Sequence, residues 1–132
     1  MSALPGVGGH LLSSTFIAEE IAALVPTPEE EHVRRELIAW RAGCSALGPA
    51  STPRTLLEVA AAPLFALLEF DRPSNIEFVD DLATATLRCG DRSVAVVVTT
   101  WGSSIDSLWR VAVTHAGRCD AAWSLLFDGR RL

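Results

Sequence analysis

Two short apolar runs stand out in the last third of the sequence, at Val94–Thr99 and Ala121–Phe127. Successive apolar positions over such a length are typical of strands that are buried on both faces. Between the runs, apolar residues recur at helical spacing and form one predicted helix face: Ile105, Leu108, Trp109, Ala112, Val113 and Ala116. This pattern predicts a strand–helix–strand unit with parallel strands and a right-handed crossover.

Local signals predict where the crossover helix begins and ends. Ser103 is the expected N-cap, and Asp106, three residues later, is the expected partner of a capping box. Gly117 is the expected end of the helix.

Two further strands precede this unit. Ile76–Val79 is a short apolar run that ends at Asp80, and Ala83–Cys89 alternates between apolar and polar residues. Strict alternation indicates a strand with two different faces. Because Gly90 and Asp91 then form a hairpin signal, an antiparallel meander is expected to lead into the parallel pair.

The first half of the sequence predicts three helices. The first is expected over Ser14–Val25, with Ser13 and Ser14 as candidate caps. The second begins after Thr27, with Pro28 at its first position and Glu30 completing a capping box, and is expected to reach about Leu47.

The third helix is expected to open at Thr52-Pro53 in the same way as the second. Pro63 falls inside it. Since proline removes a backbone donor, we expect a kink or a split near Ala62.

These elements predict an α/β (α+β) fold with a helical lead-in over residues 1–50 and an αβββαβ core over residues 51–132. The core should contain a mixed four-stranded sheet. A length of 132 residues suits one domain. Because the predicted last strand is followed only by Asp128–Leu132, we interpret the chain as the N-terminal fragment of a longer protein.

Composition narrows the functional classes. Hydrophobic residues make up 49% and charged residues 20%, which indicates a folded protein, and no apolar run reaches the roughly 18 residues of a membrane span. Three cysteines without metal-type spacing, and no secretory signal, predict a cytoplasmic protein. The net charge of −5 disfavours a domain that binds DNA by itself.

The order αβββαβ is that of the PD-(D/E)XK nuclease core, whose second and third strands supply carboxylates for a divalent metal together with a lysine. The candidate catalytic and Mg²⁺-binding residues here are Glu58, Asp80 and Asp81, and a polar turn is the alternative role of the two aspartates. The third strand, Val96–Thr100, contains neither an acid nor a lysine. We therefore assign no confirmed catalytic, cofactor-binding or metal-binding residue.

Three segments together resemble a known family. The sequence has a strand ending in Trp-Gly, a helix with Leu-Trp-Arg, and a strand of the form Trp-x-Leu-Leu-x-Asp-Gly-Arg-x-Leu. In this combination it resembles the N-terminal region of Eco57I-like (type IIG) restriction–modification DNA methylases. The segments that carry the resemblance are Val96–Gly102, Leu108–Val113 and Ala122–Leu132.

The resemblance implies a restriction-endonuclease-like domain that precedes an adenine-specific DNA methyltransferase. It implies that DNA is a partner through the parent protein, and that S-adenosylmethionine binds the following domain rather than this one. Val98–Thr100 departs from the acid-and-lysine pattern of active nucleases, which predicts a catalytically degenerate nuclease core. Mg²⁺ would be a cofactor only if the domain were an active nuclease. Two alternatives stay open: a small acidic, chaperone-like binding module acting as a homodimer, and an active Mg²⁺-dependent endonuclease that uses Glu58, Asp80 or Asp81.

Overall fold

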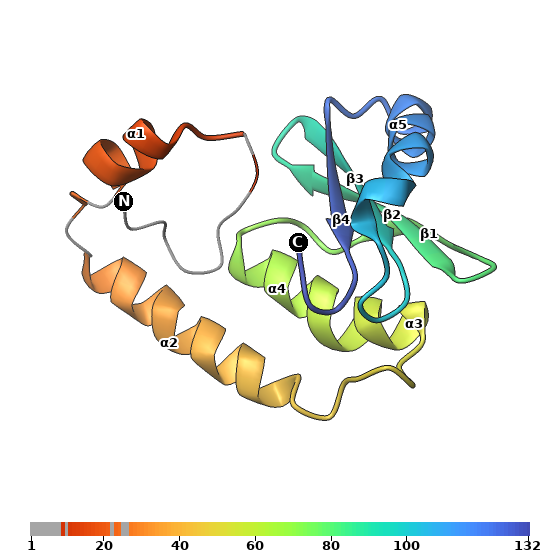
Figure 1. Cartoon of the computed structure of the whole chain (residues 1–132), viewed down its shortest axis with the longest axis horizontal. Coiled ribbons are helices and arrows are strands. Elements are labelled where there is room, and N and C mark those ends of the chain that lie inside the picture. The colour runs from red at the N-terminus through yellow and green to blue at the C-terminus, as the bar shows by residue number, and fades with distance from the viewer. Residues whose placement is uncertain (1–8, 10, 22, 25–26) are drawn as a thin grey trace. The chain divides into compact units, whose positions relative to one another are not determined.

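The computed structural model describes residues 9, 11–21, 23–24 and 27–132, and it divides into two compact units, Met1–Arg34 and Arg35–Leu132 (Figure 1). The boundary falls inside helix α2 (Pro28–Gly43). The sheet and all of the described buried residues belong to the second unit. Across the described ranges, no helix combines the length and apolar character needed to cross a membrane.

The first unit contains a short helix that starts where the sequence predicts. Helix α1 (Ser14–Phe16) continues into the π-helical turn η1 (Ile17–Ile21). The Ser13 hydroxyl caps it by accepting a hydrogen bond from the Phe16 N–H at 3.1 Å. The predicted end of this helix at Val25 lies outside the described residues.

Helix α2 opens with the predicted capping box. The Thr27 N–H donates to Glu30 Oε2 at 2.6 Å, and the Glu30 N–H donates to Thr27 Oγ1 at 3.3 Å. Each side chain thus satisfies one of the free donors at the helix start. The helix ends at Gly43, one turn before the predicted Leu47, because Cys44–Leu47 forms a turn in front of Gly48 and Pro49.

The third predicted helix is a continuous helical layer with three segments: α3 (Pro53–Thr55), the π-helical η2 (Leu56–Ala61) and α4 (Ala62–Leu67). Thr52 caps it as predicted, since its Oγ1 accepts from the Thr55 N–H at 3.2 Å. The expected irregularity near Ala62 is present as the change from π to α geometry, one residue before Pro63.

Helix α2 compensates for Pro63. Because proline has no N–H, the turn that precedes Pro63 has carbonyls without their usual helical donor. The Trp40 indole Nε1–H donates to the Ala60 carbonyl at 2.9 Å, and Cys44 Sγ lies 4.0 Å from the Val59 carbonyl. The second half of α2 is therefore held against the helical layer by a directed hydrogen bond as well as by packing.

The predicted mixed four-stranded sheet is confirmed, with strand order β1-β2-β3-β4 (Figure 1). Its strands are β1 (Ser74–Val79), β2 (Leu82–Cys89), β3 (Arg92–Val98) and β4 (Trp123–Phe127). β1, β2 and β3 are antiparallel neighbours, whereas β3 and β4 are parallel. Gly90, with φ of 63°, occupies the predicted hairpin turn between β2 and β3.

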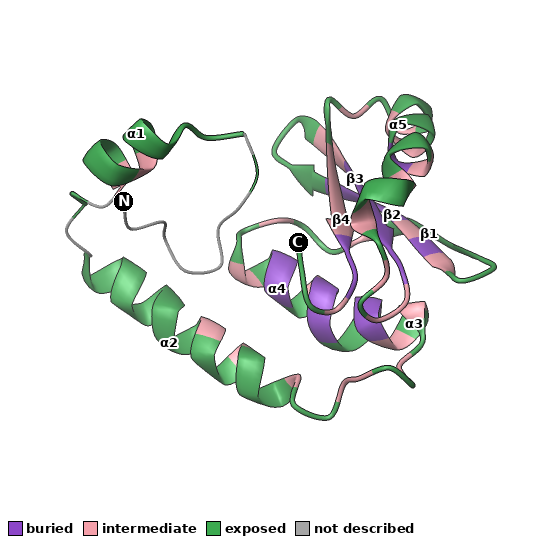
Figure 2. Cartoon of the chain, viewed as in Figure 1, coloured by how far each residue is buried: buried purple, intermediate pink, exposed green. Residues whose placement is uncertain are grey.

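The register assigns the strands two distinct faces. Ala83 pairs with Val98 and Ala85 with Val96, so these residues share the face toward η2 and α4, here called the α4 face. On this face the strands form one buried cluster with the helical layer: Leu56, Leu57, Ala60, Ala61, Phe65, Ala83, Ala85, Leu87, Val96, Val98 and Phe127 (Figure 2). The intervening residues point to the opposite face, here called the α5 face.

The crossover helix differs from its prediction at its start. A 3₁₀ turn, η3 (Ile105–Leu108), precedes α5 (Trp109–Arg118). The prediction of a Ser103–Asp106 capping box is wrong, because the Ser103 hydroxyl is hydrogen-bonded to the Thr100 hydroxyl. The N-cap of η3 is Ser104, whose side chain makes no capping bond.

The packed face and the end of α5 also differ from the prediction. Ala112 is buried against the sheet, but Trp109 and Val113 are 59% and 60% exposed. The helix continues past Gly117 to Arg118. The less exposed positions of the helix are therefore Val111, Ala112, His115 and Ala116, whereas Trp109 and Val113 lie to the side of this stripe.

Replacing Trp40 with phenylalanine tests the bond to the π-helical turn. We expect Trp40→Phe to lower the free energy of unfolding by about 1–2 kcal/mol, because an aromatic ring is kept while the buried Ala60 loses the donor to its carbonyl. Urea denaturation followed by circular dichroism gives the measurement. The matched control, Trp109→Phe on the exposed side of α5, should change stability by less than about 0.5 kcal/mol. Equal effects of the two substitutions would contradict this assignment.

Candidate functional site

Asp80 and Asp81, two of the predicted metal ligands, form the tight turn between β1 and β2. Asp80 adopts a left-handed backbone conformation, with φ of 51°. It lines a shallow depression together with Arg54 and Phe78, in which the Arg54 guanidinium lies 4.0 Å from the centre of the Phe78 ring. The other charged side chain that lines this depression is therefore a cation stacked on an aromatic ring.

Glu58, the third candidate, lies on η2 and forms an ion pair with Arg54, with 3.6 Å between Arg54 Nη1 and Glu58 Oε1. Both side chains are about 60% exposed, so this pair contributes little to stability. Arg54 thus contacts Glu58 and also lines the depression beside Asp80. Within the described ranges, no group of three or more His, Cys, Asp or Glu side chains is arranged to hold a metal ion.

The sheet positions next to these candidates are apolar. The start of β2 and the end of β3 lie side by side, because Ala83 pairs with Val98 and Thr84 with Val97. Ala83 and Val98 point to the α4 face and are completely buried. Because a hard divalent metal needs several converging oxygen ligands, this part of the α4 face provides packing rather than coordination.

The most highly organised polar group lies at the carboxyl end of the parallel pair. Asp128, directly after β4, is completely buried. Its Oδ1 accepts hydrogen bonds from the backbone N–H groups of Arg130 at 2.8 Å and Arg131 at 2.6 Å, while Oδ2 accepts one from Arg131 Nε at 3.0 Å. Arg131 Nη2 lies 2.9 Å from Oδ2 and completes an ion pair with the carboxylate. Three hydrogen bonds and one ion pair therefore satisfy this carboxylate.

The Asp128 loop joins the ends of both parallel strands. The Thr99 N–H donates to the Phe127 carbonyl at 2.9 Å, and the Gly102 N–H donates to the Asp128 carbonyl at 3.0 Å. Arg131 Nη2 also donates to the Ser103 carbonyl at 2.9 Å. The segment after β3 and the segment after β4 thus form one hydrogen-bonded unit.

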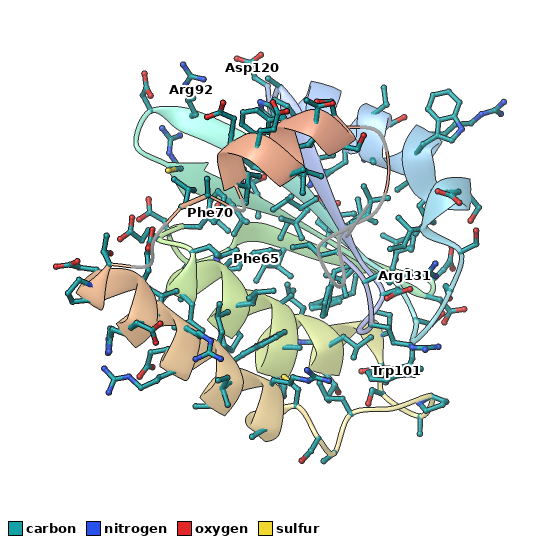
Figure 3. All side chains as sticks on the ribbon, turned by 60° about the vertical axis from the view of Figure 1, so that its left-hand side comes forward. Phe65, Phe70, Arg92, Trp101, Asp120 and Arg131 are labelled. Carbon is teal, nitrogen blue, oxygen red and sulfur yellow. The ribbon has the colours of Figure 1, made fainter. Side chains whose placement is uncertain are left out.

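A close contact between Trp101 and Gly129 completes this unit. Gly129 has φ of +84°, and a Cβ atom built there would lie 2.5 Å from Cε3 of Trp101. Only glycine combines this backbone conformation with this approach. Trp101 and Arg131 lie at one end of the second unit, and Arg92 and Asp120 lie at the other (Figure 3).

Sequence reasoning identified the Trp-Gly and Asp-Gly-Arg segments, but it did not predict that Asp128 is the buried centre of the site. The available signal was an acid followed by Gly-Arg-Arg directly after an apolar strand. Because its three hydrogen bonds and its ion pair are all internal, Asp128 is suited to fix loop geometry rather than to transfer protons.

The three cysteines are free thiols, with Cys89 exposed and Cys44 and Cys119 half-buried. Desolvation by burial raises the pKa of the Cys44 thiol. A smaller thiolate fraction makes Cys44 a weaker nucleophile than an ordinary cysteine. Its position beside the Val59 carbonyl assigns it to the packing of α2.

Comparisons with protein-family models, with curated proteins and with solved structures found no match.

Replacing Asp128 tests its structural role. We expect Asp128→Ala to lower the free energy of unfolding by about 3 kcal/mol, because two backbone donors and part of a guanidinium lose their acceptor. Asp128→Asn keeps one acceptor oxygen and should cost about half as much. Chemical denaturation measures both values, with the exposed Asp106→Ala as the control. Stability of Asp128→Ala equal to that of the control would contradict the assigned role.

The contact between Gly129 and Trp101 predicts an unusual sensitivity to one methyl group. Gly129→Ala should destabilise by about 2–3 kcal/mol, since backbone strain and overpacking add. Gly90→Ala is the matched control: its φ is also positive, at +63°, but nothing lies within 4 Å of its added Cβ, so only about 1 kcal/mol of strain is expected. Thermal unfolding compares the two. Trp101→Leu should recover part of the Gly129→Ala loss, and identical effects at the two glycines would refute the contact.

Proposed function

We propose that this chain is the cytoplasmic, nuclease-derived N-terminal domain of a bacterial restriction–modification enzyme that methylates adenine in DNA. In this proposal the domain itself neither cuts nor methylates DNA. The proposal starts from the resemblance of Val96–Gly102, Leu108–Val113 and Ala122–Leu132 to Eco57I-like methylases.

One observation carries the proposal: segments of the resemblance that are far apart in sequence meet in one hydrogen-bonded unit. Gly102, which ends the first segment, donates to the Asp128 carbonyl, and Arg131 of the third segment binds the Ser103 carbonyl. The second segment bonds to the third outside this unit, since the Ala112 carbonyl accepts from Ser124 Oγ of β4 at 3.3 Å. A shared structural role gives these motifs a reason to occur together.

The element order also supports the proposal. The second unit has the αβββαβ order that a PD-(D/E)XK-type domain requires. A helical layer comes first, three antiparallel strands follow, and a crossover helix then leads to a fourth strand parallel to the third. Because architecture alone is compatible with many functions, the resemblance motifs rather than the fold determine the choice of function.

The loss of cleavage is inferred from the residues at the nuclease positions. The third strand offers Val96, Val97 and Val98 where an acid and a lysine are needed, and all three are buried. Glu58 is paired with Arg54. The domain is therefore assigned a packing and positioning role, with S-adenosylmethionine bound by the following domain and Mg²⁺ needed only if cleavage survives.

The net charge of the chain also supports a domain that does not bind DNA by itself. A net charge of −5 opposes the approach of a phosphate backbone, whose contacts supply most of the affinity of DNA-binding proteins. DNA contact is accordingly assigned to the larger parent protein.

The proposal makes a prediction about the native gene beyond codon 132. We expect the reading frame to continue for several hundred codons and to encode an Asn-Pro-Pro-Tyr motif, because the family places its methyltransferase domain after this one. Sequencing the native locus and assaying S-adenosylmethionine-dependent methylation by the full product give the test. A stop codon at that point, together with a stable dimer of the 132-residue chain in solution, would favour the acidic homodimeric binding module instead.

A cleavage assay tests the nuclease component separately. We expect the purified chain to leave supercoiled plasmid intact in Mg²⁺ or Mn²⁺, at the level of its Glu58→Ala, Asp80→Ala and Asp81→Ala variants, because the third strand lacks the acid and lysine. Agarose gel analysis of nicking over time is the measurement. Metal-dependent nicking that Asp81→Ala abolishes would show an active endonuclease.

A further inference from the structure

Helix α5 leaves part of its sheet face uncovered. It packs against β3 and β4, where Ala112 is buried and accepts the bond from Ser124. Beside it, the β1–β2 half of the same face borders an open groove of about 340 Å³, here called the α5 groove. Its lining residues all belong to the second unit, Arg35–Leu132.

The floor of the α5 groove is apolar. It contains Val79 and Leu82 from the β1–β2 hairpin and Val111 from α5. Val79 is 61% exposed, an unusual position for a β-branched side chain on a sheet face next to a helix. Covering these side chains would remove apolar surface from water, which is the main driving force for docking.

One wall of the groove is positively charged. Arg110, Thr114 and Arg118 recur every four residues along α5, so the two arginines lie about 12 Å apart along the helix. Neither arginine forms an ion pair with any described residue. The Arg110 guanidinium lies 5.6 Å from the Trp109 ring centre, a contact that leaves its hydrogen-bond donors free.

His115 joins the helix wall of the groove to strand β2. Its Nε2–H donates to the Ala85 carbonyl at 2.7 Å. Ala85 lies opposite the irregularity of β1 between Ser74 and Glu77, where the ladder is interrupted. Because the histidine bonds the strand at this point, α5 and the hairpin form a preorganised pair of walls, which lowers the entropic cost of binding.

We propose that the α5 groove is the docking site for an acidic amphipathic helix of a separate partner protein. A helix would complete the layer that α5 begins, since exposed sheet faces in α/β domains are covered by helices. Its apolar stripe lies on Val79 and Leu82, and two carboxylates about eight residues apart pair with Arg110 and Arg118.

Charge and polarity favour this occupant over nucleic acid. The groove floor is apolar, whereas a surface that follows a phosphate backbone is mostly cationic and polar. Glu77 lines the opposite wall and would repel a phosphate chain, but it can face the polar flank of a helix. The net charge of −5 opposes any anionic partner at long range, and it opposes the densely charged phosphate chain more strongly than a helix with two carboxylates facing the arginines.

A charge-swap experiment tests the proposal with the full chain. The probe is a fluorescein-labelled amphipathic peptide of roughly 18 residues, with leucines on one helical face and two flanking glutamates about eight positions apart; its twin carries lysines instead. Fluorescence anisotropy should show about tenfold tighter binding of the glutamate peptide to the wild-type chain. The variant Arg110→Glu/Arg118→Glu should reverse this preference.

The control variant Arg72→Glu/Arg92→Glu changes the net charge equally at exposed positions outside the groove, and it should keep the wild-type preference. Val79→Asp should weaken binding of the glutamate peptide at least about tenfold, because it places a charge in the apolar floor. Equal binding of both peptides, or no binding of the glutamate peptide, overturns the proposal. Tighter binding of a duplex DNA oligonucleotide, lost in Arg110→Glu/Arg118→Glu, overturns it in favour of a nucleic-acid site.

Discussion

The strand β3 cannot be exposed to water on either face, and the rest of the second unit is arranged around this constraint. Ala95–Val98 is apolar throughout and completely buried. Covering its α4 face requires the helical layer Pro53–Leu67, and covering its other face requires α5. The crossover through α5 then returns the chain parallel to β3, because a helix between two strands of one sheet brings the second strand back in the same direction.

The parallel arrangement has a direct consequence for the polar site. Since β3 and β4 run in the same direction, the loops after both strands leave the sheet at the same edge. The buried Asp128 carboxylate holds these loops together through backbone donors and Arg131. The Trp-Gly and Asp-Gly-Arg segments, which look independent in the sequence, are therefore joined in one hydrogen-bonded unit.

The same helix that closes the core leaves the α5 groove open. α5 packs mainly over β3 and β4, and it reaches β2 through the bond from His115 to the Ala85 carbonyl, so much of the β1–β2 hairpin stays uncovered. The apolar floor and the arginine wall of the groove are therefore exposed because α5 packs mainly on β3 and β4. This arrangement separates two roles: the α4 face is a dry core, whereas the α5 face combines packing with an accessible surface.

Strands, turns and helix starts were largely predictable from the sequence. The apolar runs, the alternation in β2 and the hairpin at Gly90 predicted the strands, and Thr27 and Thr52 predicted helix starts, because each depends only on neighbouring residues. The prediction failed at Ser103, where a hydroxyl that could have capped a helix is bonded to Thr100 instead. The prediction that Trp109 packs on the sheet also failed. Helical spacing predicts an apolar stripe, but it does not predict which edge of that stripe contacts the sheet.

By itself, then, the sequence determined the element order, the mixed sheet and the burial of β3. Only the tertiary structure decided that Trp40 supports the turn before Pro63, that Asp128 is buried with three hydrogen bonds, and that Arg110 and Arg118 line an open groove. The physical reason is the range of the interactions. Caps, turns and periodicity act within a few residues, whereas the Trp40 bond joins positions 20 residues apart and the groove depends on surface that other elements leave uncovered. The donors to Asp128 are only two and three residues away, but the burial of Asp128 depends on the segment after β3, which bonds to it through Gly102.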